Sequence, residues 1–116
     1  MIQIYHNVRC GKSRNCLAFL EKSNLEFEII YYLVDNPTFE ELTSIIKKLN
    51  IKAIDLVRKN EKIWINLFKN KTLTEKEIIQ TMVDNPILIE RPILVTENKA
   101  IIARDLDKIQ DFIEKL

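Results

Sequence analysis

Apolar and polar residues alternate along the chain in two patterns, one typical of strands and one typical of helices. Residues 1–5 (MIQIY) and 27–33 (FEIIYYL) are short runs rich in branched and aromatic side chains, which predict two strands. Between them, Leu17 and Leu20 recur at helical spacing, which predicts a helix that ends near Ser23. The first third of the chain therefore predicts a strand, a helix and a second strand.

The middle of the chain has the pattern of helices. Residues 37–50 (PTFEELTSIIKKLN) begin with Thr38 and Glu41 at the spacing of a capping box and continue with one apolar helical face. A second capping box opens the helix predicted at residues 74–84 (TEKEIIQTMVD). Two shorter helical segments are predicted at residues 53–60 (AIDLVRKN) and 63–68 (IWINLF).

The last third returns to strands before a final helix. Residues 91–103 (RPILVTENKAIIA) predict two short strands joined by a turn near Asn98, and apolar residues at helical spacing then continue to Leu116. The order is β-α-β, a helical insertion and β-β-α. A βαβ unit carries a parallel strand pair, and the closing hairpin adds antiparallel strands to the same sheet. We therefore expect an α/β fold with a thioredoxin/glutaredoxin-like mixed sheet, as a single domain at residues 1–116 with a helical insertion at about 38–84.

Composition and charge narrow the class of protein. The 116 residues are 47% apolar and 30% charged, as in ordinary globular proteins, and no apolar stretch approaches the ~20 residues of a membrane span. The start MIQIYHN lacks the basic and long apolar regions of a signal peptide, so we expect a cytoplasmic protein. We also expect a monomer. Eighteen Lys and Arg against 17 Asp and Glu give a net charge of +1, which predicts no nucleic-acid or membrane partner. Any bound anion must be held locally.

The two cysteines are the candidate reactive groups. They are too few for a disulfide scaffold, and no Cys/His cluster has the spacing of a metal site, so we expect no bound metal. Cys10 stands where the first strand ends and the first helix begins, where unpaired backbone N–H groups stabilise an anion. Arg9, Lys12 and Arg14 add positive charge, and such settings lower a cysteine pKa from about 8.5 to roughly 3.5–7.5. The alternative interpretation is that Cys10 is a small buried residue that only packs against its neighbours.

The neighbours of Cys10 suggest supporting roles. Gly11 lets the backbone approach a ligand closely, and Ser13 can donate its hydroxyl to the sulfur or cap the helix. His6 is equally well interpreted as a hydrogen-bonded residue at the strand end or as a group that tunes Cys10.

Cys16 is predicted to pack in the core. Six helical residues rise ~9 Å and turn by about 240°, so Cys16 cannot reach Cys10 for a disulfide without unwinding the helix. Ser13 occupies the position that a Cys-x-x-Cys pair would need. The chemistry is then that of one thiol, and the resolving thiol comes from another molecule.

Four stretches resemble a known family. They are IYHNVRCGKSRN (4–15), LVRKNE (56–61), NPILIERPILVT (85–96) and RDLDKI, which opens with Arg104. In this order they resemble the arsenate reductases of the glutaredoxin-coupled type, within the thioredoxin-like superfamily.

The resemblance implies an activity and its residues. Cys10 would attack arsenate, or a similar oxyanion, held by Arg58, Arg91 and Arg104. Guanidinium groups bind such oxygens through paired hydrogen bonds that an ammonium group cannot reproduce. Glutathione would be the co-substrate and glutaredoxin a partner, with no bound cofactor.

The resemblance also implies supporting features. His6 and Ser13 match family positions beside the thiol, and the peptide bond before Pro92 is expected to be cis. Two alternatives stay open. One is a Spx-like redox-sensing transcription regulator that binds RNA polymerase, against which Ser13 argues because those proteins typically carry Cys-x-x-Cys. The other is a general glutathione-dependent thiol reductase, for which three arginines would be superfluous.

Overall fold

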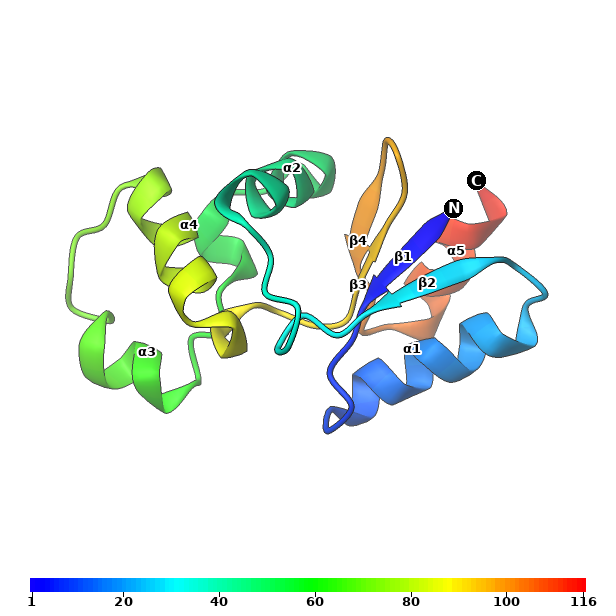
Figure 1. Cartoon of the computed structure of the whole chain (residues 1–116), viewed down its shortest axis with the longest axis horizontal. Coiled ribbons are helices and arrows are strands. Elements are labelled where there is room, and N and C mark those ends of the chain that lie inside the picture. The colour runs from blue at the N-terminus through cyan, green and yellow to red at the C-terminus, as the bar shows by residue number, and fades with distance from the viewer. The chain divides into compact units, whose positions relative to one another are not determined.

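The predicted strands form one four-stranded sheet in the computed structural model, which describes all 116 residues (Figure 1). The strands are β1 (Ile2–Tyr5), β2 (Phe27–Ile30), β3 (Ile93–Val95) and β4 (Ala100–Ile102). Their order is β2-β1-β3-β4, in which β1 pairs with β2 in parallel and the two other pairs are antiparallel. This arrangement confirms the predicted mixed sheet.

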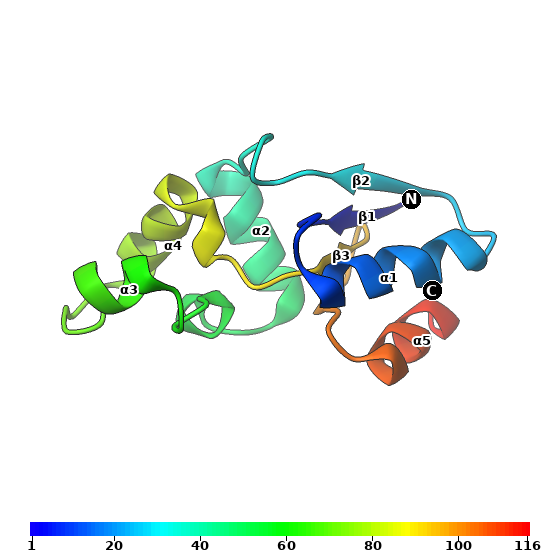
Figure 2. The same ribbon diagram turned by 90° about the horizontal axis from the view of Figure 1, so that it is seen from below.

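Two helices, α1 (Gly11–Lys22) and α5 (Leu106–Glu114), pack against this sheet. Figure 2 shows both helices on one side of the strands. The core between them consists of buried side chains from β1, β3, both helices and the segment after β4: Ile2, Ile4, Cys16, Leu20, Leu94, Ala103, Ile109 and Phe112. The sheet and its two helices make a compact unit of Met1–Asp35 and Arg91–Leu116, called here the first unit.

The remaining residues, Asn36–Glu90, make a helical second unit. Its elements are α2 (Phe39–Leu49), the 3-10 helix η1 (Ala53–Leu56), α3 (Lys62–Leu67), α4 (Glu75–Asp84) and the 3-10 helix η2 (Pro86–Leu88). Both predicted capping boxes are present, because Thr38 and Thr74 each accept a hydrogen bond from the third helical N–H, and a glutamate at that position returns one. The caps explain why α2 and α4 begin where the sequence predicts.

The strand predicted at residues 27–33 is too long. β2 ends at Ile30, because the chain then turns so that the carbonyl of Tyr31 accepts the N–H of Asp35 at 2.8 Å. The pairing partner also ends there, since Ile30 pairs with Tyr5, the last residue of β1. Strand composition alone does not reveal where a partner strand stops.

The helical segment predicted at residues 53–60 is also too long. Only Ala53–Leu56 is helical, and Val57 instead forms an isolated antiparallel bridge with Ile89. The N–H of Arg58 donates to the carbonyl of Leu88 at 2.7 Å. This bridge places extended backbone within the second unit at a position that the helical pattern does not predict.

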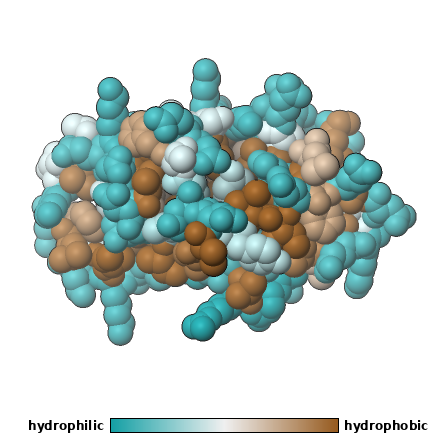
Figure 3. Space-filling view, viewed as in Figure 1, coloured by the Kyte–Doolittle hydropathy of each residue, from teal (hydrophilic) through white to brown (hydrophobic).

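Two further features bear on function. The peptide bond between Arg91 and Pro92 is cis, as the family resemblance implied. None of the helices has both the length and the apolar content needed to cross a membrane. Polar side chains, drawn in teal, are interspersed with apolar ones on the face shown in Figure 3.

Candidate active site

Cys10 is the residue that caps the start of α1. Its backbone is extended, with φ −94° and ψ 121°, and its carbonyl accepts the first helical bond from the N–H of Arg14 at 3.0 Å. Its own N–H donates to the carbonyl of Asn7 at 3.1 Å. The side chain is partly exposed. The thiol therefore stands at a helix N-terminus, as predicted, and is accessible to other molecules.

The surroundings of Cys10 lower its pKa. Burial by itself would raise the pKa of the thiol, but hydrogen bonds from the backbone N–H of Ser13 and from the side chains of Arg91 and Arg104 outweigh it. The charge of Arg91 acts in the same direction, and together these groups lower the pKa to about 7. Each of these groups stabilises the thiolate, which is the nucleophilic form. A large fraction of Cys10 is thus ionised at neutral pH.

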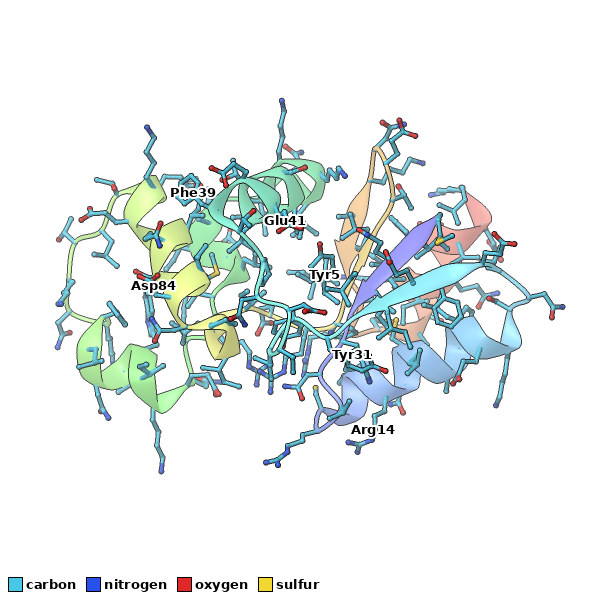
Figure 4. The ribbon with its side chains drawn as sticks, viewed as in Figure 1. Tyr5, Arg14, Tyr31, Phe39, Glu41 and Asp84 are labelled. Atoms are coloured by element: carbon cyan, nitrogen blue, oxygen red, sulfur yellow. The ribbon has the colours of Figure 1, made fainter.

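The cations that act on Cys10 are not those next to it in sequence. The sequence pointed to Arg9, Lys12 and Arg14, but none of these contributes to the lowered pKa. The guanidinium of Arg14 instead donates to the carbonyl of Val8 at 3.1 Å on the exposed side of the loop (Figure 4). Side chains early in a helix diverge around its axis, so proximity in sequence does not place their charges at the thiol.

Arg104 and Arg91 are held together beside the sulfur. One nitrogen of Arg104, Nη1, donates to the carbonyl of Arg91 at 2.6 Å and lies 3.9 Å from Sγ of Cys10. The carbonyl of Pro92 accepts the N–H of Ala103 at 2.8 Å, which ties the segments that carry the two arginines. The fold therefore brings two of the three predicted arginines to Cys10.

Arg58, the third predicted arginine, belongs to the second unit. Its Nη1 lies 3.2 Å from Oε1 of Glu90, with which it forms a half-buried ion pair. Its Nε is buried and has no hydrogen-bond partner. A guanidinium with an unused donor can still bind an oxygen, and the role of Arg58 in holding an anion stays a prediction.

Ser13 and His6 form a buried pair that ties the end of β1 to α1. The Ser13 hydroxyl lies 2.6 Å from Nδ1 of His6 and accepts the N–H of Asn7 at 3.0 Å. Burial and the nearby charge of Arg14 lower the pKa of His6, so the ring is neutral at neutral pH. The Ser13 hydroxyl is therefore used inside the protein, and the expectation that it would bond the sulfur or cap the helix is wrong. Ser13 reaches the thiol through its backbone N–H instead.

Gly11 has no neighbour that requires a glycine. A Cβ atom added there would meet only Nη2 of Arg14, at an ordinary 3.7 Å. The backbone beside Cys10 is therefore open on this side, which leaves room for a ligand or partner to approach it.

Cys16 is fully buried in the core of the first unit, as the helix geometry predicted. Burial raises the pKa of its thiol to about 12, so the thiolate is absent at neutral pH. Both cysteines are free, and only Cys10 is accessible.

Asn7 and Tyr31 are two residues of the site that the sequence analysis missed. The Asn7 side chain accepts the N–H of Arg9 at 2.9 Å, in the local turn that asparagine favours, and so shapes the loop before Cys10. An asparagine directly after a strand is a signal that can be read from sequence. Tyr31 packs its ring edge-on against His6, with the ring centroids 5.9 Å apart. That contact depends on strand pairing and has no local signal.

The possible metal-binding side chains of the protein do not cluster. No group of three or more His, Cys, Asp or Glu residues is arranged to hold a metal ion. The chemistry that the geometry supports is nucleophilic attack by a thiolate on a group held by arginines.

Comparison with known proteins agrees with this geometry. The model of the ArsC family matches residues 5–112. The chain is 37% identical over 114 residues to the uncharacterized protein YfgD of Escherichia coli, covering 97% of the chain and 96% of that protein. It is 37% identical over 113 residues to an arsenate reductase of Yersinia enterocolitica, covering 97% of the chain and 80% of that protein. The solved structure of an arsenate reductase from Vibrio cholerae has a TM-score of 0.89 at 31% identity, covering 95% of each chain.

Proposed function

The chain belongs to the ArsC family, and from this premise we propose that it reduces arsenate to arsenite with Cys10 as the nucleophile. One observation carries the proposal most directly. Nη1 of Arg104 lies 3.9 Å from Sγ of Cys10, and the guanidinium groups of Arg91 and Arg104 help to lower the pKa of that thiol to about 7. A site that gathers a thiolate and cations in one place is suited to an anionic electrophile.

The proposed reaction begins with binding of the oxyanion. Arg91 and Arg104 offset the repulsion between the thiolate and the anion, and Arg58 is the third proposed ligand. The Cys10 thiolate attacks arsenic, an As–S bond forms, and an As–O bond breaks as one oxygen leaves as water after protonation. The product is a thiol-linked arsenate, in which arsenic is still As(V).

External thiols then supply the electrons. We propose that glutathione reduces the adduct: the As–S bond breaks, arsenic keeps the electron pair and becomes As(III), and Cys10 is left in a mixed disulfide with glutathione. Glutaredoxin resolves this disulfide and restores the thiol. One disulfide thus forms for each arsenite released, in keeping with the buried and protonated state of Cys16. The reducing cytoplasm would supply both thiols.

A coupled assay tests the proposal. NADPH consumption is measured in the presence of glutathione, glutathione reductase and glutaredoxin, with and without arsenate. NADPH oxidation that requires arsenate and is accompanied by the formation of arsenite supports the proposal. Cys10→Ser should abolish it, whereas the matched variant Cys16→Ala, which removes the buried thiol, should retain most of it.

Other results would point to the alternatives. Reduction of glutathione mixed disulfides without any response to arsenate indicates a general thiol reductase. No turnover with either substrate, together with binding to RNA polymerase, indicates a Spx-like regulator. Loss of activity in a folded Cys16→Ala variant would show that an internal thiol resolves the adduct.

A further inference from the structure

A cleft of about 310 Å³ opens between the start of α1 and the start of α5. Its volume falls at the lower end of the ~300–1,000 Å³ typical of small-molecule sites. One residue links it to the thiol, because Arg104, whose Nη1 lies 3.9 Å from Sγ of Cys10, is part of its lining. The polar residues of the lining are Lys12, Asn15, Arg104, Asp105 and Asp107.

The charges of this cleft are of both signs. Lys12 on α1 is exposed and forms no ion pair, and Asp107 on α5 is exposed and likewise has no cationic partner. Asp105 already uses its carboxylate to accept the N–H of Asp107 at 2.8 Å. The two carboxylates offset the two cations of the lining, Lys12 and Arg104, so the cleft has no net charge with which to hold an oxyanion alone. The cleft therefore suits a ligand that carries a positive and a negative group close together.

We propose that this cleft binds the γ-glutamyl arm of glutathione and thereby directs its sulfur to Cys10. The free α-amino acid end of that arm carries one carboxylate and one ammonium group. Lys12 would contact the carboxylate and Asp107 the ammonium. The inference rests on the proposed function, since it assigns a binding site to the thiol that reduces the Cys10 adduct.

The test uses thiol–disulfide exchange, which needs no arsenate. The Cys10 thiolate attacks one sulfur of glutathione disulfide, so that a Cys10–glutathione disulfide forms and the original S–S bond breaks. Glutathione thiolate leaves with the electron pair of that bond. Mass spectrometry of the intact protein gives the rate, and the same rate with uncharged hydroxyethyl disulfide corrects for changes in the reactivity of Cys10. The ratio of the rate with glutathione disulfide to the rate with hydroxyethyl disulfide measures how well the protein recognises the glutathione part.

Two substitutions and two matched controls define the expected result. Lys12→Gln and Asp107→Asn should each lower the ratio about threefold to fivefold, the size expected for the loss of one exposed ion pair. Lys22→Gln and Glu21→Gln make the same charge changes at exposed positions at the far end of α1 and should leave it unchanged. Asp107→Asn is decisive, because glutathione disulfide is a net anion and general electrostatics would make this variant react faster.

A series of disulfides with and without the γ-glutamyl arm gives a second measurement. The disulfide of γ-glutamylcysteine keeps the arm and should react as fast as glutathione disulfide, whereas the disulfide of cysteinylglycine lacks it and should be slower. An unchanged ratio in both variants, a rise for Asp107→Asn, or no preference within the series would overturn the assignment of the cleft. Arsenate turnover that persists in that case would leave the proposed function standing. Conversely, the expected ratios without arsenate turnover would support the cleft and refute arsenate as the substrate.

Discussion

Cys10 owes its ionisation to the backbone N–H of nearby Ser13 and to two residues far from it in the chain, Arg91 and Arg104, of which Arg104 is 94 residues away. With a pKa of about 7, the reactive thiolate should increase as pH rises through 7 and fall about tenfold for each unit below it. We predict that the rate of alkylation by iodoacetamide follows this curve between pH 5 and 9. Mass mapping should place the label on Cys10.

Cys10→Ser provides the control for this profile, because its remaining thiol, Cys16, is buried with a pKa of about 12 and should react slowly throughout. A midpoint near the ordinary cysteine value of about 8.5, or preferential labelling of Cys16, would contradict the prediction.

At the proposed anion site, the paired hydrogen-bond donors of arginine are expected to matter as well as its positive charge. Arg→Lys at Arg58, Arg91 or Arg104 keeps the charge and removes the planar fork, and each charge-assisted bond lost is worth about 1.5–3 kcal/mol. We predict that each variant lowers arsenate-dependent turnover roughly tenfold to a hundredfold. Arg9→Lys, on the exposed loop, should remain within about twofold. Wild-type turnover in all three variants, without protection of Cys10 by arsenate, would exclude an oxyanion site.

Single residues of the site were predictable from sequence only where a local pattern marks them. Cys10 was found because a strand end and a helix start can be read locally, and Cys16 because helix geometry separates it from Cys10. The local pattern failed for the cations, since Arg9, Lys12 and Arg14 do not lower the Cys10 pKa. Arg91 and Arg104 came from a family resemblance, because their approach to the sulfur depends on the folded chain.

At the scale of elements, helices were easier to predict than strands. The starts of α2 and α4 are encoded in four consecutive residues, because a capping box satisfies its own donors. The end of β2 depends instead on the length of β1, which no residue of β2 encodes. The bridge between Val57 and Ile89 is non-local in the same way, which is why a helical segment was predicted over part of it.

The contact between the end of β1 and the start of α1 gives a test at this scale. Ser13→Ala removes the hydroxyl that accepts the Asn7 N–H and pairs with His6, and it leaves both groups buried without this partner. We predict a loss of about 1–3 kcal/mol in the free energy of unfolding, measured by urea denaturation. Ser44→Ala, at an exposed position of α2, should change it by less than about 0.5 kcal/mol. Equal stabilities of the two variants would show that the buried pair contributes nothing.

At the scale of the whole molecule, most of the fold could be predicted from the order of its helices and strands. A βαβ start, a helical insertion and a β-β-α end are enough to define the mixed sheet, because parallel pairs need a crossover and hairpins do not. The helical insertion at about 38–84 stays a prediction, and its residues lie within the helical second unit of Asn36–Glu90. The local pattern of the sequence did not show that Glu90 ends one compact unit and Arg91 begins the other. That boundary is set by contacts between distant residues.

Net charge is a property of the whole molecule and of no single helix or strand, and it leads to a prediction about salt. With 18 basic and 17 acidic residues the molecule has almost no long-range field, so the proposed substrate, arsenate, would have to be bound by short-range contacts. The 3.9 Å between Arg104 Nη1 and Cys10 Sγ is shorter than the Debye length of about 8 Å at 0.15 M salt, and part-buried groups are screened weakly. We therefore predict that raising sodium chloride from about 20 to about 200 mM changes the arsenate concentration that half-protects Cys10 from alkylation by less than about threefold. Potassium chloride should give the same result, which controls for binding of the cation. A tenfold or larger change would show that the anion is attracted by a long-range field, which a nearly neutral chain of this composition does not supply.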